Sequence, residues 1–161
     1  MSKAALLIID MQKNCYKETS DRVSFERAVT YINKTSEIFR IKNYQVIIIQ
    51  DTNAGGPGTE AFPVVDEILV SDKDHVIHKQ SCNAFWETEL DGLLKREGVD
   101  CVIVSGFAAQ YCVLSTYNGA IERGYKAFIL QNGVAGSNEG ELKELQWQRH
   151  VISHEALEYF L

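Results

Sequence analysis

Short apolar runs rich in β-branched residues recur along this chain of 161 residues, separated by longer segments of a different pattern. The runs do not alternate apolar with polar residues, which is the pattern expected of strands buried on both faces of a sheet. Such strands need a covering layer on each side, so they constrain the fold strongly. The clear runs cover residues 4–9, 45–50, 101–105 and 125–130, and the weaker ones cover residues 75–78 and 150–153.

The intervening segments carry apolar residues at helical spacing, as Phe25, Ile32 and their neighbours do in residues 21–42. Gly98 and Gly124 each follow one of these segments, as glycine commonly does at a helix end. The sequence therefore predicts helices over residues 21–42, 84–97, 112–123, 139–148 and 154–161, with another short helix over residues 63–70.

Alternating strands and helices imply parallel strand pairing with right-handed crossovers. We therefore predict an α/β protein with three layers, α/β/α, about six strands and one domain over residues 1–161. In such sheets the active crevice lies outside the carboxyl ends of the strands. Reactive groups are therefore sought directly after the predicted strands, where the chain has Asp10, Asp51, Lys79, the turn 106–112 and Asn132.

The composition narrows the class of protein further. Sixteen Lys and Arg against 22 Asp and Glu give a net charge of −6, which argues against nucleic acid or an anionic membrane as a partner. The apolar runs are too short to span a bilayer, and the N-terminus lacks the pattern of a signal peptide. Four cysteines without CxxC spacing are typical of reduced thiols. We therefore expect a cytoplasmic protein.

Three of the residues that follow strands form a coherent chemical set. Cys112 opens a predicted helix, where the helix dipole lowers the pKa of a thiol, and a nearby Lys79 would lower it further. Asp10 could take the thiol proton and pass it to a leaving group. Taken singly, each residue also has an ordinary interpretation. Asp10 could be a turn residue, Lys79 a solvated surface charge and Cys112 a small buried side chain.

Three segments carry a resemblance to a known family. They read LIIDMQ at residues 7–12, HKQSCNAF at 78–85 and SGFAAQYCV at 105–113. In this order they resemble the isochorismatase-like cysteine hydrolase superfamily, which includes nicotinamidases, N-carbamoylsarcosine amidohydrolases and related amidases. The resemblance covers most of the chain, from residue 4 to about residue 130, and implies a parallel six-stranded sheet of order 3-2-1-4-5-6.

The resemblance also implies the catalytic roles. Cys112 would be the nucleophile, Asp10 the base and acid, and Lys79 the group that orients and polarises the pair. A non-proline cis peptide would join Phe107 and Ala108, so that the N–H groups of Ala108 and Cys112 face an oxyanion. Isochorismatases proper cleave a vinyl ether and lack this cysteine, so Cys112 favours hydrolysis of a small carboxamide through a thioester.

The substrate pocket and the metal site are less regular. Cys15 stands where the family has a pocket phenylalanine, unless Tyr16 fills that place. Nicotinamidases hold a metal with Asp-x-His, but here Asn53 replaces the histidine and residues 54–74 contain none. We therefore expect neither metal nor cofactor, and nicotinamide is disfavoured as the substrate. Residues expected to line the pocket are Gln12, Cys15, Tyr16, Asp51, Phe85 and Tyr111.

Two alternatives from other classes stay open. In a redox or stress-associated thiol protein, Cys112 would pass through a sulfenic acid that Cys15 or Cys82 resolves. In a non-catalytic member, the pocket would bind a small ligand or the surface would serve assembly, although the complete set of Asp10, Lys79 and Cys112 argues against a loss of catalysis. For the hydrolase, the expected partner is a small-molecule substrate. The resemblance further implies a homo-oligomer, either a dimer or a larger ring.

Overall fold

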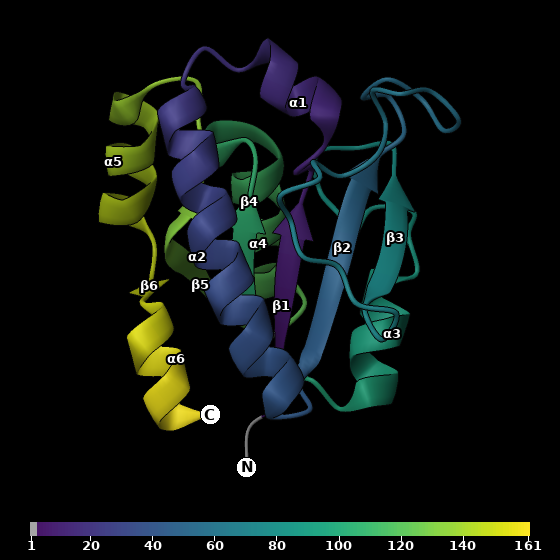
Figure 1. The fold of residues 1–161 in the computed structure, drawn as a ribbon. Helices are drawn as coiled ribbons and strands as arrows, with labels where there is room; N and C mark the ends of the chain where they lie inside the picture. Colours follow the sequence, from purple (N-terminus) through teal and green to yellow (C-terminus); the bar gives the residue numbers. More distant parts are fainter. Residues whose placement is uncertain (1–2) are drawn as a thin grey trace.

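The computed structural model describes residues 3–161 and contains one six-stranded parallel sheet (Figure 1). The strand order is β3-β2-β1-β4-β5-β6, which confirms the predicted order 3-2-1-4-5-6. Every predicted apolar run forms a strand. Their bounds are β1 Ala4–Ile9, β2 Gln45–Asp51, β3 His75–Lys79, β4 Cys101–Gly106, β5 Lys126–Val134 and β6 Val151–Ile152.

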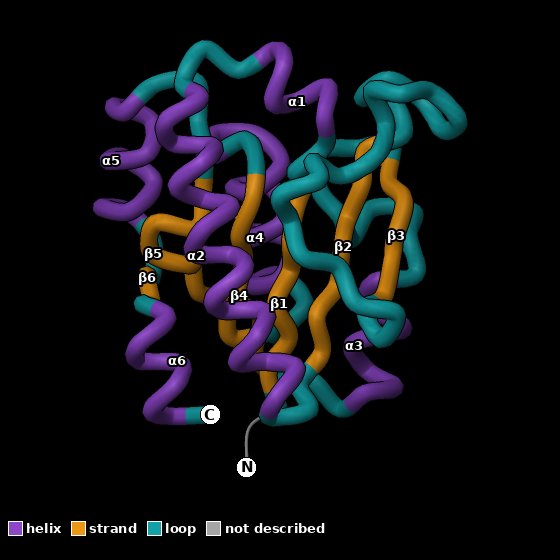
Figure 2. Tube along the Cα trace, viewed as in Figure 1, coloured by secondary structure: helices purple, strands orange, loops and turns teal. Residues whose placement is uncertain are grey.

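Helices lie between most consecutive strands, but residues 52–74 join β2 to β3 without a helix (Figure 2). The α-helices are α1 Lys13–Glu18, α2 Arg22–Ile41, α3 Leu90–Glu97, α4 Leu114–Glu122, α5 Glu139–Gln148 and α6 His154–Phe160, and a π-helical turn, η1, covers Ala109–Val113. No helix of the described residues is both long enough and apolar enough to cross a membrane.

The predicted helix over residues 63–70 is wrong. This segment instead pairs with the chain that follows β1, where Lys13 N–H donates to the Pro63 carbonyl and Val65 N–H to the Met11 carbonyl, each at 2.9 Å. Gln12 and Val64 form an antiparallel bridge there. The backbone groups are therefore satisfied without a helix. The helix α1, which was not predicted from the sequence, begins directly after this bridge.

The helix predicted from residue 84 begins six residues later. The Asn83 side chain accepts a hydrogen bond from Phe85 N–H, and the Thr88 hydroxyl accepts one from Leu90 N–H. These side chains satisfy the backbone in turns and compete with helix formation. Glu87 also adopts a left-handed conformation with φ 51°, which an α-helix excludes. The apolar spacing therefore indicates this helix correctly only from Leu90 onward.

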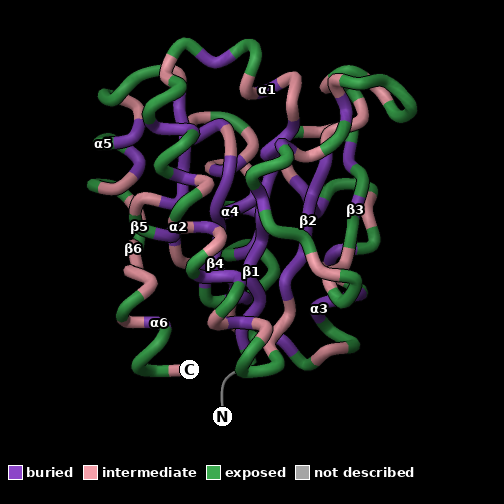
Figure 3. The backbone as a smooth tube through the Cα atoms, in the orientation of Figure 1, coloured by how far each residue is buried: buried purple, intermediate pink, exposed green. Residues whose placement is uncertain are grey.

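Alternate residues of each central strand point to opposite faces, so each strand contributes to two cores. In β1, Ala5, Leu7 and Ile9 face one core. Leu6 and Ile8 face the other. All six residues of β1 are buried, as Figure 3 shows for the middle of the sheet. The continuous apolar run of the sequence is therefore a direct consequence of burial on both faces.

Helices α3, α4 and α5 pack their apolar residues into the first core. Helices α1, α2 and α6 pack theirs into the second. In Figure 1, the long helix α2 crosses in front of the sheet while α4 lies behind it. The three predicted layers, α/β/α, are thus confirmed, and the carboxyl ends of the strands are left to loops and turns.

Gly106 ends β4 where that strand pairs with β1, opposite Ile9. Its φ is +112°, and a β-carbon there would overlap the backbone oxygen of Ile9. We expect Gly106→Ala to lower the stability by at least about 4 kcal/mol, because neither backbone can move out of the sheet. Urea unfolding measures this effect.

Gly124→Ala is the matched control for this substitution. Gly124 also has a positive φ, +87°, but no atom lies within 4 Å of the position that a β-carbon would take there. Gly124→Ala therefore measures only the cost of a non-glycine residue at positive φ, about 1 kcal/mol. The additional loss in Gly106→Ala is then due to the overlap of its β-carbon with Ile9. Equal losses in the two variants would show that the sheet accommodates a side chain at Gly106.

Candidate active site

The carboxyl ends of three neighbouring strands carry the charged residues of the site. Asp10 follows β1, Asp51 ends β2 and Lys79 ends β3. Asp51 and Lys79 are direct partners in the parallel register of β2 and β3, and Asp10 N–H donates to the Ile49 carbonyl at 2.9 Å. The strand order reverses between β1 and β4, which is the place where such sheets bind ligands.

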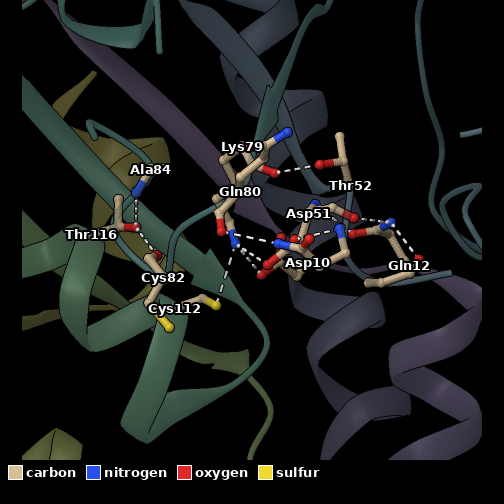
Figure 4. Close-up of polar contacts among 12 residues, drawn as sticks. Asp10, Gln12, Asp51, Thr52, Lys79, Gln80, Cys82, Ala84, Cys112 and Thr116 are labelled. Atoms are coloured by element: carbon tan, nitrogen blue, oxygen red, sulfur yellow. Dashed lines mark hydrogen bonds and ion pairs between the residues drawn. The ribbon is translucent and has the colours of Figure 1, made fainter. Parts of the chain in front are cut away.

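The Lys79 ammonium is the centre of this cluster (Figure 4). Its Nζ lies 2.8 Å from Oδ2 of Asp10, 3.1 Å from Oδ2 of Asp51 and 3.4 Å from Sγ of Cys112. The side chain of Lys79 is fully buried, and that of Asp10 is 4% exposed. A lysine is rarely buried without partners, so the ammonium is held by these anionic and polar groups.

The turn that carries Cys112 differs from the predicted helix start. After β4, the Phe107–Ala108 peptide bond is cis, as the family resemblance implies. The chain then forms η1, and the α-helix α4 begins only after Cys112. Tyr111 N–H and Val113 N–H both donate to the Ala108 carbonyl. Cys112 therefore lies inside a π-helical turn, a feature found frequently at functional sites.

The expected lowering of the Cys112 pKa is not found. Burial raises the pKa of this thiol, the Asp10 carboxylate raises it further, and Lys79 offsets only part of the increase. The helix-dipole argument fails because Cys112 does not open an α-helix and stands beside an anion. The surroundings of Cys112 therefore favour the neutral thiol over the thiolate.

Asp10 carries a buried carboxyl beside both Lys79 and Cys112. Burial raises the pKa of its carboxyl, although Lys79 lowers it through its charge and hydrogen bond. Its Oδ1 is buried and accepts no hydrogen bond from the described residues, and one of its carboxylate oxygens lies within 4.8 Å of Sγ of Cys112. Asp10 also has a backbone φ of 50°, in the left-handed region, which is uncommon for residues other than glycine and is found often at functional sites.

The ammonium of Lys79 stays protonated in this setting. Burial by itself would lower its pKa, but the neighbouring carboxylates of Asp10 and Asp51 raise it overall. Lys79 can therefore stabilise negative charge that develops on the Cys112 sulfur without itself losing a proton.

The pH dependence of alkylation tests the protonation of Cys112. We expect iodoacetamide to modify it with no inflection below about 8.5, the ordinary pKa of a thiol, because burial and Asp10 disfavour the thiolate. Peptide mass spectrometry resolves the rate, with Cys101 as the reference, since burial raises the pKa of that thiol to about 11. A Cys112 inflection near pH 7 would show a resting thiolate instead.

The residues expected to line the pocket occupy different places. Gln12 is fully buried and its amide binds the backbone of Asp51 and Phe62. Phe85 points into the core, where its ring stacks on Tyr125 at 5.9 Å between centroids. Tyr111 is 59% exposed. Gln12 and Phe85 therefore serve the fold, whereas Asp51 stands within the charged cluster.

Cys15 and Tyr16 both lie on α1. Cys15 is buried, and this burial raises the pKa of its thiol to about 12. The hydroxyl of Tyr16 donates to Glu26 at 2.9 Å. Tyr16 lines a cavity of about 530 Å³ between α1, α2 and the loop at Val65. That cavity contains none of Asp10, Lys79 and Cys112.

A smaller, polar cavity of about 270 Å³ lies beside the end of β3. Most of its residues were not predicted from the sequence, although they follow from the rule that strand ends form the crevice. Thr52, one of them, donates both its N–H and its hydroxyl to the Lys79 carbonyl. The others are His78, Lys79, Gln80, Ser81, Trp86 and Glu87.

A metal ion at this site would have to compete with a positive charge of the protein itself. Asp10, Asp51 and Cys112 bring ligand atoms within 4.8 Å of one another, but the Lys79 ammonium lies among them and already contacts all three. Asn53 stands where nicotinamidases have a histidine, and its amide donates to the Gln80 carbonyl at 3.0 Å. A positive charge is thus already built into the cluster.

The chain combines a doubly wound α/β sheet with a buried cluster of Asp10, Lys79 and Cys112 at its carboxyl edge. It belongs to the isochorismatase family, because the family model "Isochorismatase domain" matches residues 4–155.

Individual relatives agree with this assignment. The uncharacterized isochorismatase family protein YddQ of Bacillus subtilis is 26% identical over 162 residues, covering 96% of this chain and 87% of that protein. An isochorismatase-like hydrolase from Alkaliphilus metalliredigens has a similar crystal structure, with a TM-score of 0.86, 25% identity and 98% of each chain covered. The ureidoacrylate amidohydrolase RutB of Methylorubrum extorquens is 29% identical over 108 residues, which cover 62% of this chain and 44% of RutB.

Proposed function

We propose that the protein is a cysteine-dependent amidohydrolase that cleaves a small carboxamide or a related carbonyl compound without a metal ion. The observation that carries the proposal is the Lys79 ammonium, which contacts both Asp10, at 2.8 Å, and Cys112, at 3.4 Å. A nucleophile, a proton acceptor and a fixed positive charge are thus adjacent. The name of RutB, an amidohydrolase, supports a C–N bond as the one that is cleaved.

The first half of the proposed reaction forms a thioester. As Sγ of Cys112 attacks the amide carbonyl carbon, its proton passes to Asp10. The N–H groups of Ala108 and Cys112 face the oxygen that becomes negative, and Lys79 stabilises the charge on sulfur. Asp10 then gives the proton to the amide nitrogen, the C–N bond breaks, and ammonia or an amine leaves.

The second half regenerates the enzyme. Asp10 takes a proton from water, whose oxygen attacks the thioester carbon. The C–S bond breaks, the carboxylic acid leaves, and the proton held by Asp10 returns to the Cys112 sulfur. The raised pKa of Asp10 suits this repeated exchange, because a carboxyl that is too acidic would donate its proton poorly.

The test is a panel of small carboxamides and ureido compounds, with ammonia release measured before and after treatment with a chelator. We expect release from at least one compound, unchanged by the chelator, and a thioester at Cys112 in the intact mass of rapidly quenched enzyme. Loss of activity with the chelator and recovery with a divalent ion would refute metal independence. Absence of the adduct during turnover would refute the thioester route.

The thiol-redox alternative has less support. A resolving cysteine must reach its thiolate form, and burial raises the pKa of Cys15 to about 12. Cys82 is exposed and stands near Cys112 in Figure 4. Peroxide treatment followed by peptide mapping separates the functions, since a Cys112–Cys82 disulfide would favour redox chemistry.

We further propose that the chain acts as a single domain in the cytoplasm and as a homo-oligomer, with a small molecule as its substrate. All four cysteines are free, which suits a reducing compartment. Trp147 on α5 and Phe160 on α6 are 91% and 77% exposed, which favours a contact between subunits.

A further inference from the structure

Asp51 uses both oxygens of its carboxylate within the cluster. Oδ2 lies 3.1 Å from Nζ of Lys79, and Oδ1 accepts the N–H of Asn53 at 2.8 Å. The side chain is 19% exposed, so this carboxylate is partly shielded from water. Its orientation is therefore set by the protein and not by solvent.

The backbone of Asp51 is fixed as firmly as its side chain. Its N–H donates to Oε1 of Gln12 at 2.8 Å, and its carbonyl accepts from Nε2 of the same amide at 3.2 Å. Gln12 is itself fully buried and lies two residues after Asp10. The end of β2 is thus joined to the chain that carries Asp10, and the distance between the two carboxylates is set by this amide.

The three contacts of Lys79 match the three N–H groups of an ammonium. Two of these contacts are to reacting groups, Asp10 and Cys112, and the third is to Asp51. The third contact is chemically distinct because the proposed reaction never changes the charge of Asp51. Asp10, in contrast, becomes neutral each time it accepts a proton.

We propose that Asp51 is a positioning residue, which holds the Lys79 ammonium between Asp10 and Cys112 throughout the reaction cycle. This inference rests on the proposed function of the same site. When Asp10 is protonated, its attraction for Lys79 weakens, and Asp51 becomes the remaining carboxylate on the ammonium. The ammonium then stays beside the sulfur at the moment when negative charge develops there.

The substitution Asp51→Asn tests this role. Asparagine has the same shape, keeps an acceptor for Asn53 N–H and leaves the hydrogen bonds between the Gln12 amide and the backbone in place. It loses the negative charge that holds Lys79. We expect kcat to fall by about 10- to 100-fold with KM changed less than about twofold, since misplacing a catalytic group costs rate more than binding. Asp51→Glu, which keeps the charge, should recover part of the loss.

Asp66→Asn is the matched control. Asp66 is 83% exposed and pairs with Lys13 outside the cluster, so its loss should leave kcat unchanged. An Asp51→Asn enzyme with normal kcat, or one whose defect lies only in KM, would overturn the positioning role while leaving the amidohydrolase proposal intact.

A second measurement does not depend on activity. Trace acetylation with acetic anhydride, followed by peptide mass spectrometry, compares the reactivity of Lys79 with that of the exposed Lys143. We expect the Lys79/Lys143 ratio to rise several-fold in Asp51→Asn and to stay near the wild-type value in Asp51→Glu and Asp66→Asn. An unchanged ratio in Asp51→Asn would overturn the inference.

Together the two measurements separate the two proposals. If the wild type hydrolyses no amide but the acetylation ratio rises in Asp51→Asn, the amidohydrolase proposal fails, while Asp51 is still shown to hold the Lys79 ammonium. If the Asp51→Asn protein does not fold, Asp51→Glu decides the question. An Asp51→Glu enzyme with full activity and a raised Lys79/Lys143 acetylation ratio would show that the reaction does not need a fixed ammonium.

Discussion

Replacing the nucleophile in Cys112→Ala is expected to lower kcat/KM for an amide substrate by at least about 10⁴-fold. Without the sulfur no thioester can form, and the oxyanion-binding N–H groups and Lys79 alone supply only residual catalysis. The thiol is small and half-buried, and it lies 3.4 Å from Lys79 and interacts with Asp10. The fold should therefore be retained. Ammonia release and the melting temperature measure the two parts of this expectation.

Cys101→Ala is the control for the Cys112 substitution. It removes the same atom from the same chain, but Cys101 stands at the beginning of β4, at the opposite end of the strand from the turn that carries Cys112. Its activity should stay within about twofold of the wild type. Equal ammonia release by Cys112→Ala and the wild type would refute nucleophilic catalysis by this cysteine, and comparable losses in both variants would indicate a general effect on folding.

The strands could be predicted well because their signal is local. A run such as residues 4–9 is buried on both faces, so every residue in it is apolar and no neighbouring segment is needed to recognise it. The beginning of α3 depends instead on Asn83 and Thr88, whose side chains compete with the helix for backbone groups. The segment 63–70 depends on a partner about 50 residues earlier in the chain.

The candidate site also combines features that the sequence could indicate with features that depend on distant parts of the chain. The sequence could indicate that Asp10, Lys79 and Cys112 lie together, because strand ends converge at one edge of a parallel sheet. It could not indicate how protons are distributed among them. That distribution depends on burial and on distances of a few ångström, and at Cys112 burial and the Asp10 carboxylate together outweigh the effect of Lys79. The role of Gln12 could not be predicted either, since its hydrogen bonds reach residues 39 to 50 positions away.

Lys79→Met should have the largest effect on stability. Methionine fills much of the same volume, but two carboxylates are left side by side, and Asp10 is almost completely buried. Removing one member of a buried ion pair typically costs about 3–5 kcal/mol, because the remaining charge stays in a poorly solvating environment. We therefore expect the free energy of unfolding at pH 7 to fall by that amount, as measured by urea denaturation. Lys143→Met, which removes an exposed pair with Glu139, should cost no more than about 0.5 kcal/mol.

The pH dependence of this loss distinguishes an unpaired charge from a packing defect. Lys79 lowers the pKa of Asp10, so the substitution raises that pKa further above the ordinary value of 3.8 for an aspartate. A carboxyl with a raised pKa binds more protons in the folded state than in the unfolded state, and stability then falls as the pH rises from the unfolded pKa through the folded one. The difference between the wild type and Lys79→Met should therefore be largest near pH 7 and shrink toward pH 4, where Asp10 is protonated in the variant. A difference that is constant with pH would mean that the lost contacts of the lysine stem, and not the unpaired carboxylates, account for the destabilisation.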